Sequence, residues 1–99
     1  MANYKNAATD RFIDVIAAMK SREECYALFE DLCTIKEIKE MSQRLEVAVL
    51  LSKGKSYQEV NAETGVSTAT ISRVSKCLSY GSGGYLEALK IINEKESAK

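Results

Sequence analysis

The side chains best suited to recognising another molecule lie on one face of the segment 68–76. The outward positions of this segment are small or basic: Thr68, Ala69, Ser72, Arg73 and Lys76. Small side chains permit close approach to base edges in the DNA major groove, where methyl groups contact thymine and hydroxyls reach donors or acceptors. Basic side chains one turn further on meet phosphates or a guanine. The pattern therefore predicts a face that binds DNA.

Catalytic and metal chemistry have little support in this sequence. The chain has no histidine, and its cysteines, Cys25, Cys33 and Cys77, form no C-x-x-C pair. A zinc site needs four nitrogen or sulfur ligands, or three and a water, and no nucleophile stands beside a recognisable base. We therefore expect no enzyme activity, no metal and no cofactor, with the cysteines acting as small core residues or passive thiols.

The composition is that of a single soluble domain made of helices. The 99 residues are 45% hydrophobic and 28% charged, with no proline and no apolar run approaching the roughly 18 residues of a membrane span. Residues 1–10 contain no apolar stretch of the kind found in secretory signals. These features predict an all-α, cytoplasmic protein that does not associate with membranes.

Charge gives a divided indication. Fourteen basic and fourteen acidic residues cancel over the whole chain, whereas many nucleic-acid binders are strongly basic. Between Ser42 and Ser79, however, five basic residues outnumber three acidic ones. The basic excess thus coincides with the segment that is expected to meet DNA.

The elements that position this face can be located from capping patterns. Three Ser/Thr-x-x-Glu sequences, Ser21–Glu24, Thr34–Glu37 and Ser56–Glu59, are candidate capping boxes at helix starts. Together with apolar periodicity and glycine stops, they predict about six short helices, at approximately 9–20, 22–33, 35–52, 57–63, 68–78 and 85–94.

The fourth and fifth of these helices form a predicted helix-turn-helix at about 57–78. Val60 and Thr64 face inward, Gly65 can adopt positive φ, Val66 is an apolar plug and Ser67 caps the next helix. That helix buries a narrow stripe at positions 71, 74 and 78. Gln58 and Ser67 complete the set of expected DNA-binding residues. The alternative interpretation is a helical hairpin with a purely structural role.

The stretches 53–60 and 64–74 resemble the Trp-repressor superfamily, in particular its YerC/YecD-type branch. Segments 31–38 and 78–85 resemble it as well, so the similarity covers roughly Ser21 to Tyr85. The resemblance implies one domain over residues 1–99, in which six helices intertwine with a second copy and the N- and C-terminal helices form the dimer. The apolar faces of the first and last helices independently favour a homodimer, because one small subunit offers them little to pack on.

The resemblance also bears on a small-molecule effector. In the tryptophan-sensing members, two arginines sandwich the indole and a glycine follows the second. By position, Arg44 and Arg73 resemble those arginines and Thr34 resembles a third pocket residue, but Val74 replaces the glycine and Cys77 replaces a pocket serine. Tryptophan is therefore not expected to bind. Arg44 can equally be a solvated or ion-paired residue, and Arg73 a phosphate contact.

These patterns predict a sequence-specific DNA-binding transcriptional regulator, more specifically a repressor. A homodimer would place one recognition helix in each of two major grooves, about 34 to 36 Å apart on double-stranded DNA. The alternative function is a helical protein-interaction module that keeps the fold without specific DNA binding, which the neutral net charge favours.

Overall fold

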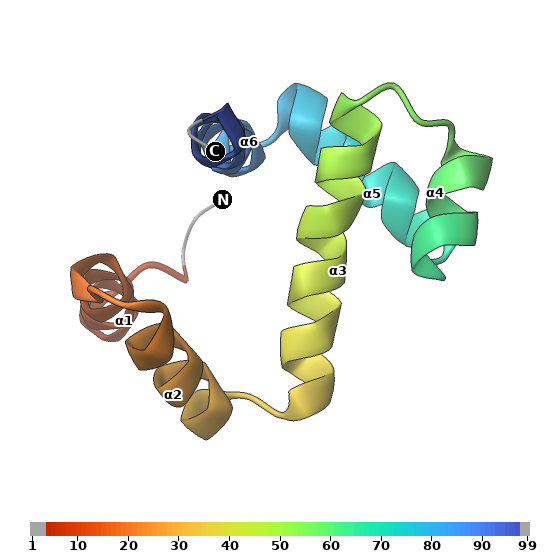
Figure 1. Ribbon diagram of the computed structural model, residues 1–99. Helices are drawn as coiled ribbons and strands as arrows, with labels where there is room; N and C mark the ends of the chain where they lie inside the picture. The colour runs from red at the N-terminus through yellow and green to blue at the C-terminus, as the bar shows by residue number, and fades with distance from the viewer. Residues whose placement is uncertain (1–3, 98–99) are drawn as a thin grey trace. The chain divides into compact units, whose positions relative to one another are not determined.

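Helices account for most of the chain. The computed structural model describes residues 4–97 (Figure 1). Its elements, in chain order, are α1 (Ala7–Ala18), α2 (Arg22–Leu32), α3 (Ile35–Ser52), α4 (Tyr57–Thr64), α5 (Thr68–Tyr80) and α6 (Gly84–Ser97). Residues 4–97 contain no strand. The predicted all-α fold of about six helices is confirmed.

The chain forms two compact units, Met1–Ile38 and Lys39–Lys99. The first unit holds α1, α2 and the beginning of α3. The second holds the rest of α3 together with α4, α5 and α6. No helix between residues 4 and 97 is long and apolar enough to cross a membrane.

Local caps set the helix starts. Ser56 and Glu59 exchange hydrogen bonds in a full capping box, and Thr34 and Glu37 do the same. Ser21 caps α2 through the Glu24 N–H, but the Glu24 carboxylate accepts from the Lys20 N–H instead of from Ser21. Two of the three predicted boxes are therefore complete, and the third is half formed.

The ends of three helices differ from the sequence expectation. Helix α1 begins at Ala7 because Asn6 and Thr9 form a capping box that the Ser/Thr-x-x-Glu pattern does not include. Helix α5 continues to Tyr80, and α6 runs to Ser97. At Gly81, where the chain leaves α5, an added Cβ would lie 2.5 Å from the Cys77 carbonyl oxygen. A glycine is therefore required at this exit.

The second unit has a small apolar core that holds the helix-turn-helix. Buried side chains from α3, α4 and α5 form it: Val47, Ala48, Leu50, Val60, Ile71 and Val74. Leu78 packs against this cluster from the same side of α5 as Ile71 and Val74. The predicted apolar stripe of the fifth helix is confirmed. Helix α5 is thus seated on the C-terminal half of α3, with α4 packed beside it (Figure 1).

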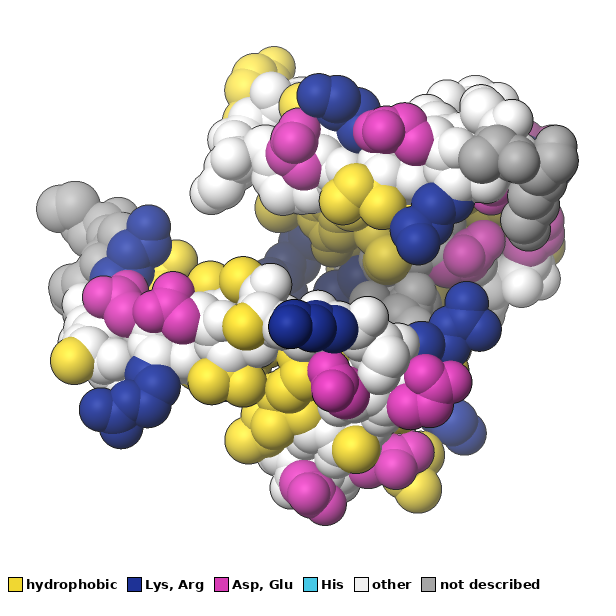
Figure 2. Space-filling model, turned by 60° about the vertical axis from the view of Figure 1, so that its left-hand side comes forward, with side chains coloured by type: hydrophobic (Ala, Val, Ile, Leu, Met, Phe, Trp, Pro, Cys, Tyr) yellow, Lys and Arg dark blue, Asp and Glu magenta, His cyan; other side chains and the backbone are white. Residues whose placement is uncertain are grey.

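The first unit has no comparable core. None of the residues Ala7–Ala18 or Arg22–Leu32 is buried. Ile13 is 57% exposed, Tyr26 58% and Leu32 54%, and apolar side chains reach the molecular surface (Figure 2). Burying apolar area is worth about 25 cal/mol per Å², so these helices leave much of their available stabilisation unused in one copy of the chain.

Candidate nucleic-acid interface

A three-residue turn joins α4 to α5, and its geometry begins with Gly65. This residue has φ 75° and ψ 3°, in the left-handed region, and its N–H donates to the Asn61 carbonyl at 2.8 Å. L-residues with a Cβ rarely adopt this conformation, whereas glycine does so without steric cost. The positive φ predicted at this position is confirmed.

Ser67 caps the start of α5. Its hydroxyl accepts from the Thr70 N–H at 3.2 Å and donates to the Thr70 hydroxyl at the same distance. The predicted cap is therefore present, and the Ser67 side chain is engaged in it. The N–H groups of Thr68 and Ala69 donate to no atom of residues 4–97. They are the free donors that a helix start offers to an acceptor.

Helix α5 has two contrasting faces. Ile71 and Val74 are 0% and 3% exposed. The positions expected to meet DNA lie at other angles around the helix, where Ser72 is half-buried and the rest are exposed: Thr68, Ala69, Arg73 and Lys76. The helix therefore presents small polar and basic side chains away from the core that supports it.

The two basic side chains of α5 are not neutralised within the described chain. The ion pairs found among residues 4–97 join Lys55 to Glu63 at 3.4 Å and Lys90 to Glu87 at 3.6 Å. Arg73 and Lys76 take part in neither. Their charges remain available to an anionic partner such as a phosphate backbone.

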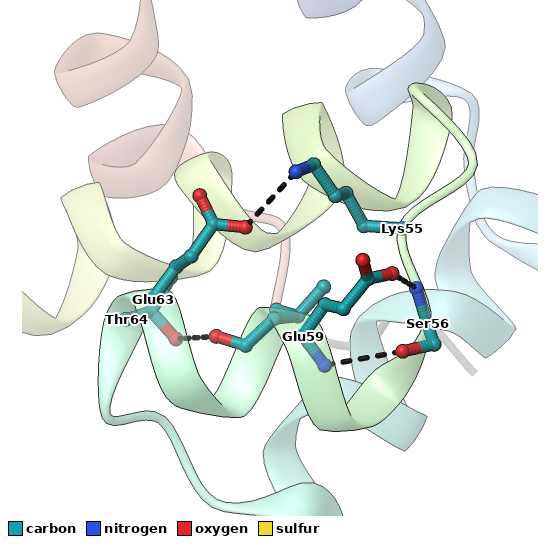
Figure 3. Close-up of polar contacts among 6 residues, drawn as sticks. Lys55, Ser56, Glu59, Glu63 and Thr64 are labelled. Carbon is teal, nitrogen blue, oxygen red and sulfur yellow. Dashed lines mark hydrogen bonds and ion pairs between the residues drawn. The ribbon is translucent and has the colours of Figure 1, made fainter.

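The start of α4 is rigidly capped (Figure 3). The Ser56 N–H donates to Glu59 Oε1 at 2.8 Å, and the Glu59 N–H donates to Ser56 Oγ at 3.1 Å. The backbone hydrogen bond from Ser56, then the one from its hydroxyl and the charge of Lys55, lower the pKa of Glu59 below its ordinary value. Gln58 lies exposed in this first turn.

The residues assigned to a possible effector pocket occupy different surroundings. Arg44 lines a recess of about 180 Å³ together with Glu40 of α3, Ser67 of the turn and Thr70 of α5. Cys77 lines another recess, with Leu45 and Tyr85. Val74 lies in the core, and Arg73 is exposed. Thr34 caps α3 and belongs to the first unit.

Arg44 forms no ion pair with the described residues, Glu40 and Glu46 included. The cysteines are free, Cys25 and Cys33 half-buried and Cys77 exposed. Between residues 4 and 97, no cluster of His, Cys, Asp or Glu side chains is arranged to hold a metal ion.

Sequence reasoning missed the polar contacts that hold the turn itself. The Asn61 side-chain amide donates to the Val66 carbonyl at 2.8 Å, and the Val66 N–H donates to Thr64 Oγ1 at 3.1 Å. Asparagine and threonine next to a glycine turn are known to hydrogen-bond nearby backbone. That composition was the available signal, but the partner atoms depend on the path of the turn.

Comparisons with known proteins agree with this geometry. Residues 7–93 match the Trp repressor protein family. The chain is 50% identical over 88 residues to the uncharacterized protein YerC of Bacillus subtilis (strain 168), covering 89% of this chain and 85% of YerC.

Two crystal structures are also similar. A Staphylococcus aureus protein provisionally assigned as a Trp repressor is 44% identical, with a TM-score of 0.87 over 92% of this chain and 91% of that one. A TrpR-like protein from Eubacterium eligens ATCC 27750 is 40% identical, with a TM-score of 0.88 over 94% and 96%. The chain therefore belongs to the Trp repressor family of helix-turn-helix DNA-binding regulators.

Proposed function

We propose that this protein is a sequence-specific transcriptional regulator, a repressor, that binds double-stranded DNA as a homodimer. The observation that carries the proposal is the division of α5 into a buried stripe and an exposed face of small and basic side chains. A merely structural hairpin has no need of two unpaired cations on its solvent side. A recognition helix does.

The proposed binding mode follows from the positions along the hairpin. Recognition helices of this type contact bases through their N-terminal residues while the preceding helix crosses the backbone. Thr68, Ala69 and Ser72 would then read base edges, and Arg73 and Lys76 would hold phosphates. Gln58 at the start of α4 would meet the backbone. Ser67 would act chiefly as the cap that fixes the helix start, since its hydroxyl is already engaged.

The homodimer is supported by apolar surface that a single copy leaves uncovered. In α1 the side chain of Phe12 is 40% exposed, and in α6 Leu86 and Ile91 are 53% and 54% exposed. No residue of Gly84–Ser97 is buried. A second copy of the chain would offer complementary apolar faces and would set two recognition helices at the half-site spacing of about 34 to 36 Å.

Tryptophan is not the proposed effector. Val74 fills space within the core, in the position where the tryptophan-sensing members carry a glycine, and Arg44 and Cys77 line separate recesses. The regulator is therefore proposed to bind DNA without tryptophan.

The test of this function is a comparison of α5 variants on DNA. A preferred site is first selected from random duplexes, and affinities for it and for a scrambled duplex are measured over a salt series. Lys76→Ala should weaken binding to both duplexes and reduce the salt dependence by about one unit, because one phosphate contact is lost. Ser72→Ala should cost about 1–3 kcal/mol on the preferred site and little on the scrambled one.

Lys39→Ala is the matched control, since it removes an equal charge from an exposed position on α3 and should leave both affinities unchanged. Melting curves establish that each variant is folded. If Lys76→Ala, Arg73→Ala and Ser72→Ala all bind DNA as the parent does, the hairpin is structural. A protein-interaction module, consistent with the net charge of zero, would then replace this proposal.

A further inference from the structure

Both backbone polar groups of Val66, in the turn before α5, are hydrogen-bonded to side chains of α4. The Val66 carbonyl accepts a hydrogen bond from Asn61 Nδ2 at 2.8 Å, and the Val66 N–H donates to Thr64 Oγ1 at 3.1 Å. The Thr64 hydroxyl in turn donates to the Val60 carbonyl at 2.7 Å (Figure 3). Both polar groups of the Val66 backbone are thus tied to the preceding helix.

This arrangement lies next to Gly65, the one glycine within residues 57–80. Gly65 is the residue least restricted by sterics, and no atom lies within 4 Å of the position that its Cβ would occupy. Only Val66 and Ser67 then separate it from α5. Hydrogen bonds to the Val66 N–H and C=O therefore help to fix the direction in which α5 starts, and with it the positions of Thr68 and Ala69.

The two side chains differ in what else they do. Thr64 is half-buried and is bonded within its own helix, so replacing it also disturbs the last turn of α4. Asn61 is exposed and contributes nothing to the apolar core. An exposed hydrogen bond adds little to stability, yet it removes alternative conformations of the element that must fit a partner, which is the preorganisation that increases affinity.

Resting on the proposed DNA-binding function, we propose that Asn61 is a positioning residue for sequence recognition. It touches no base itself. Its amide holds the Val66 carbonyl so that the N-terminal turn of α5 is presented to the major groove in one orientation. The requirement applies to base reading, which depends on orientation, and much less to phosphate attraction, which tolerates several orientations.

The experiment compares Asn61→Ala and Asn61→Leu with the parent chain. Leucine retains the approximate size of asparagine without its donor, and neither change alters the net charge. Affinities for the selected duplex and for a scrambled duplex are measured over a salt series, with thermal melting of each variant. Ser42→Ala is the matched control, because the Ser42 hydroxyl also makes an exposed hydrogen bond to backbone, at 2.9 Å to the Lys39 carbonyl, but within a single helix.

We expect both Asn61 variants to bind the selected duplex about fivefold more weakly, the usual net contribution of one hydrogen bond. Affinity for the scrambled duplex and its salt dependence should stay at parental values, the melting temperature should fall by no more than about 8 °C, and Ser42→Ala should behave as the parent throughout.

Three results would overturn the inference. Parental affinity for the selected duplex in both variants would show that the hydrogen bond from Asn61 to the Val66 carbonyl is dispensable. Equal weakening on both duplexes with a reduced salt dependence would make Asn61 a phosphate contact, and equal weakening with a lowered melting temperature would make it structural. A parent chain that prefers no sequence at all would refute the proposed function and this inference with it, a result distinct from the other three.

Discussion

At the scale of the residue, the side chain of Val74 is part of the core that supports α5. It is 3% exposed and belongs to the cluster formed with Val47, Ala48, Leu50, Val60 and Ile71. In the tryptophan-sensing relatives that the sequence resembles, a glycine in this position makes room for the indole. Here the branched side chain packs in the core and contributes to the support of α5.

We predict from this packing that free tryptophan does not bind. Calorimetric titration with millimolar L-tryptophan should give no saturable heat. Val74→Gly should lose stability, because it empties core volume and places glycine in a helix interior, which together cost ~2–4 kcal/mol. Saturable binding of tryptophan by the parent chain at micromolar concentration would show that the indole is accommodated beside Val74.

At the scale of the element, α5 combines a packed side with the face proposed to read DNA. The packed side depends on Ile71, which is fully buried among residues of α3 and α4. The proposed reading face includes exposed residues such as Thr68. Under this proposal, a mutation on either side weakens DNA binding, for different physical reasons.

Ile71→Ala is predicted to lower the free energy of unfolding by ~2–5 kcal/mol through the cavity that it leaves. It should also weaken binding to every duplex, because α5 loses packing contacts with α3 and α4. Thr68→Ala should leave the free energy of unfolding within about 0.5 kcal/mol of the parent value and should lower the affinity for the preferred site only. Chemical denaturation combined with the two-duplex assay separates the effects. An Ile71→Ala protein as stable as the parent would contradict the core described here.

At the scale of the whole molecule, one copy of the chain buries little of its apolar surface. The helices α1, α2 and α6 contain no buried residue. Ile35 at the start of α3 is 73% exposed. Large exposed apolar surfaces of this kind mark interaction sites. Here the exposed apolar surface includes the helices that are proposed to form the dimer.

We predict a stable homodimer at micromolar concentration, measured by sedimentation equilibrium. Ile13→Asp should shift the equilibrium towards monomer, because a buried unpaired carboxylate costs several kcal/mol or must be protonated. Asp14→Asn, a neighbouring exposed position, serves as the control and should leave the dimer intact. A folded monomer that unfolds cooperatively would refute the prediction.

Much of the helix-turn-helix was predictable because its determinants are local. A cap such as Ser56 or Ser67 acts on an N–H three residues away, and Gly65 alone permits the left-handed turn. The periodicity of Ile71 and Val74 likewise identifies the buried face without reference to any other element. The early start of α1 escaped prediction because its cap uses Asn6 and Thr9, a pair that the Ser/Thr-x-x-Glu pattern does not include.

The sequence by itself determined the helices, their caps, the turn and the face of α5 that is free to bind, since each follows from interactions within a few residues. Only the tertiary structure decided which distant side chains share a surface. Arg44 lies in the same recess as Ser67, while Cys77 lines a different one. It also decided that Asn61 reaches the Val66 carbonyl. These relations depend on how helices pack and where a turn leads, and residue spacing along one helix carries no information about either.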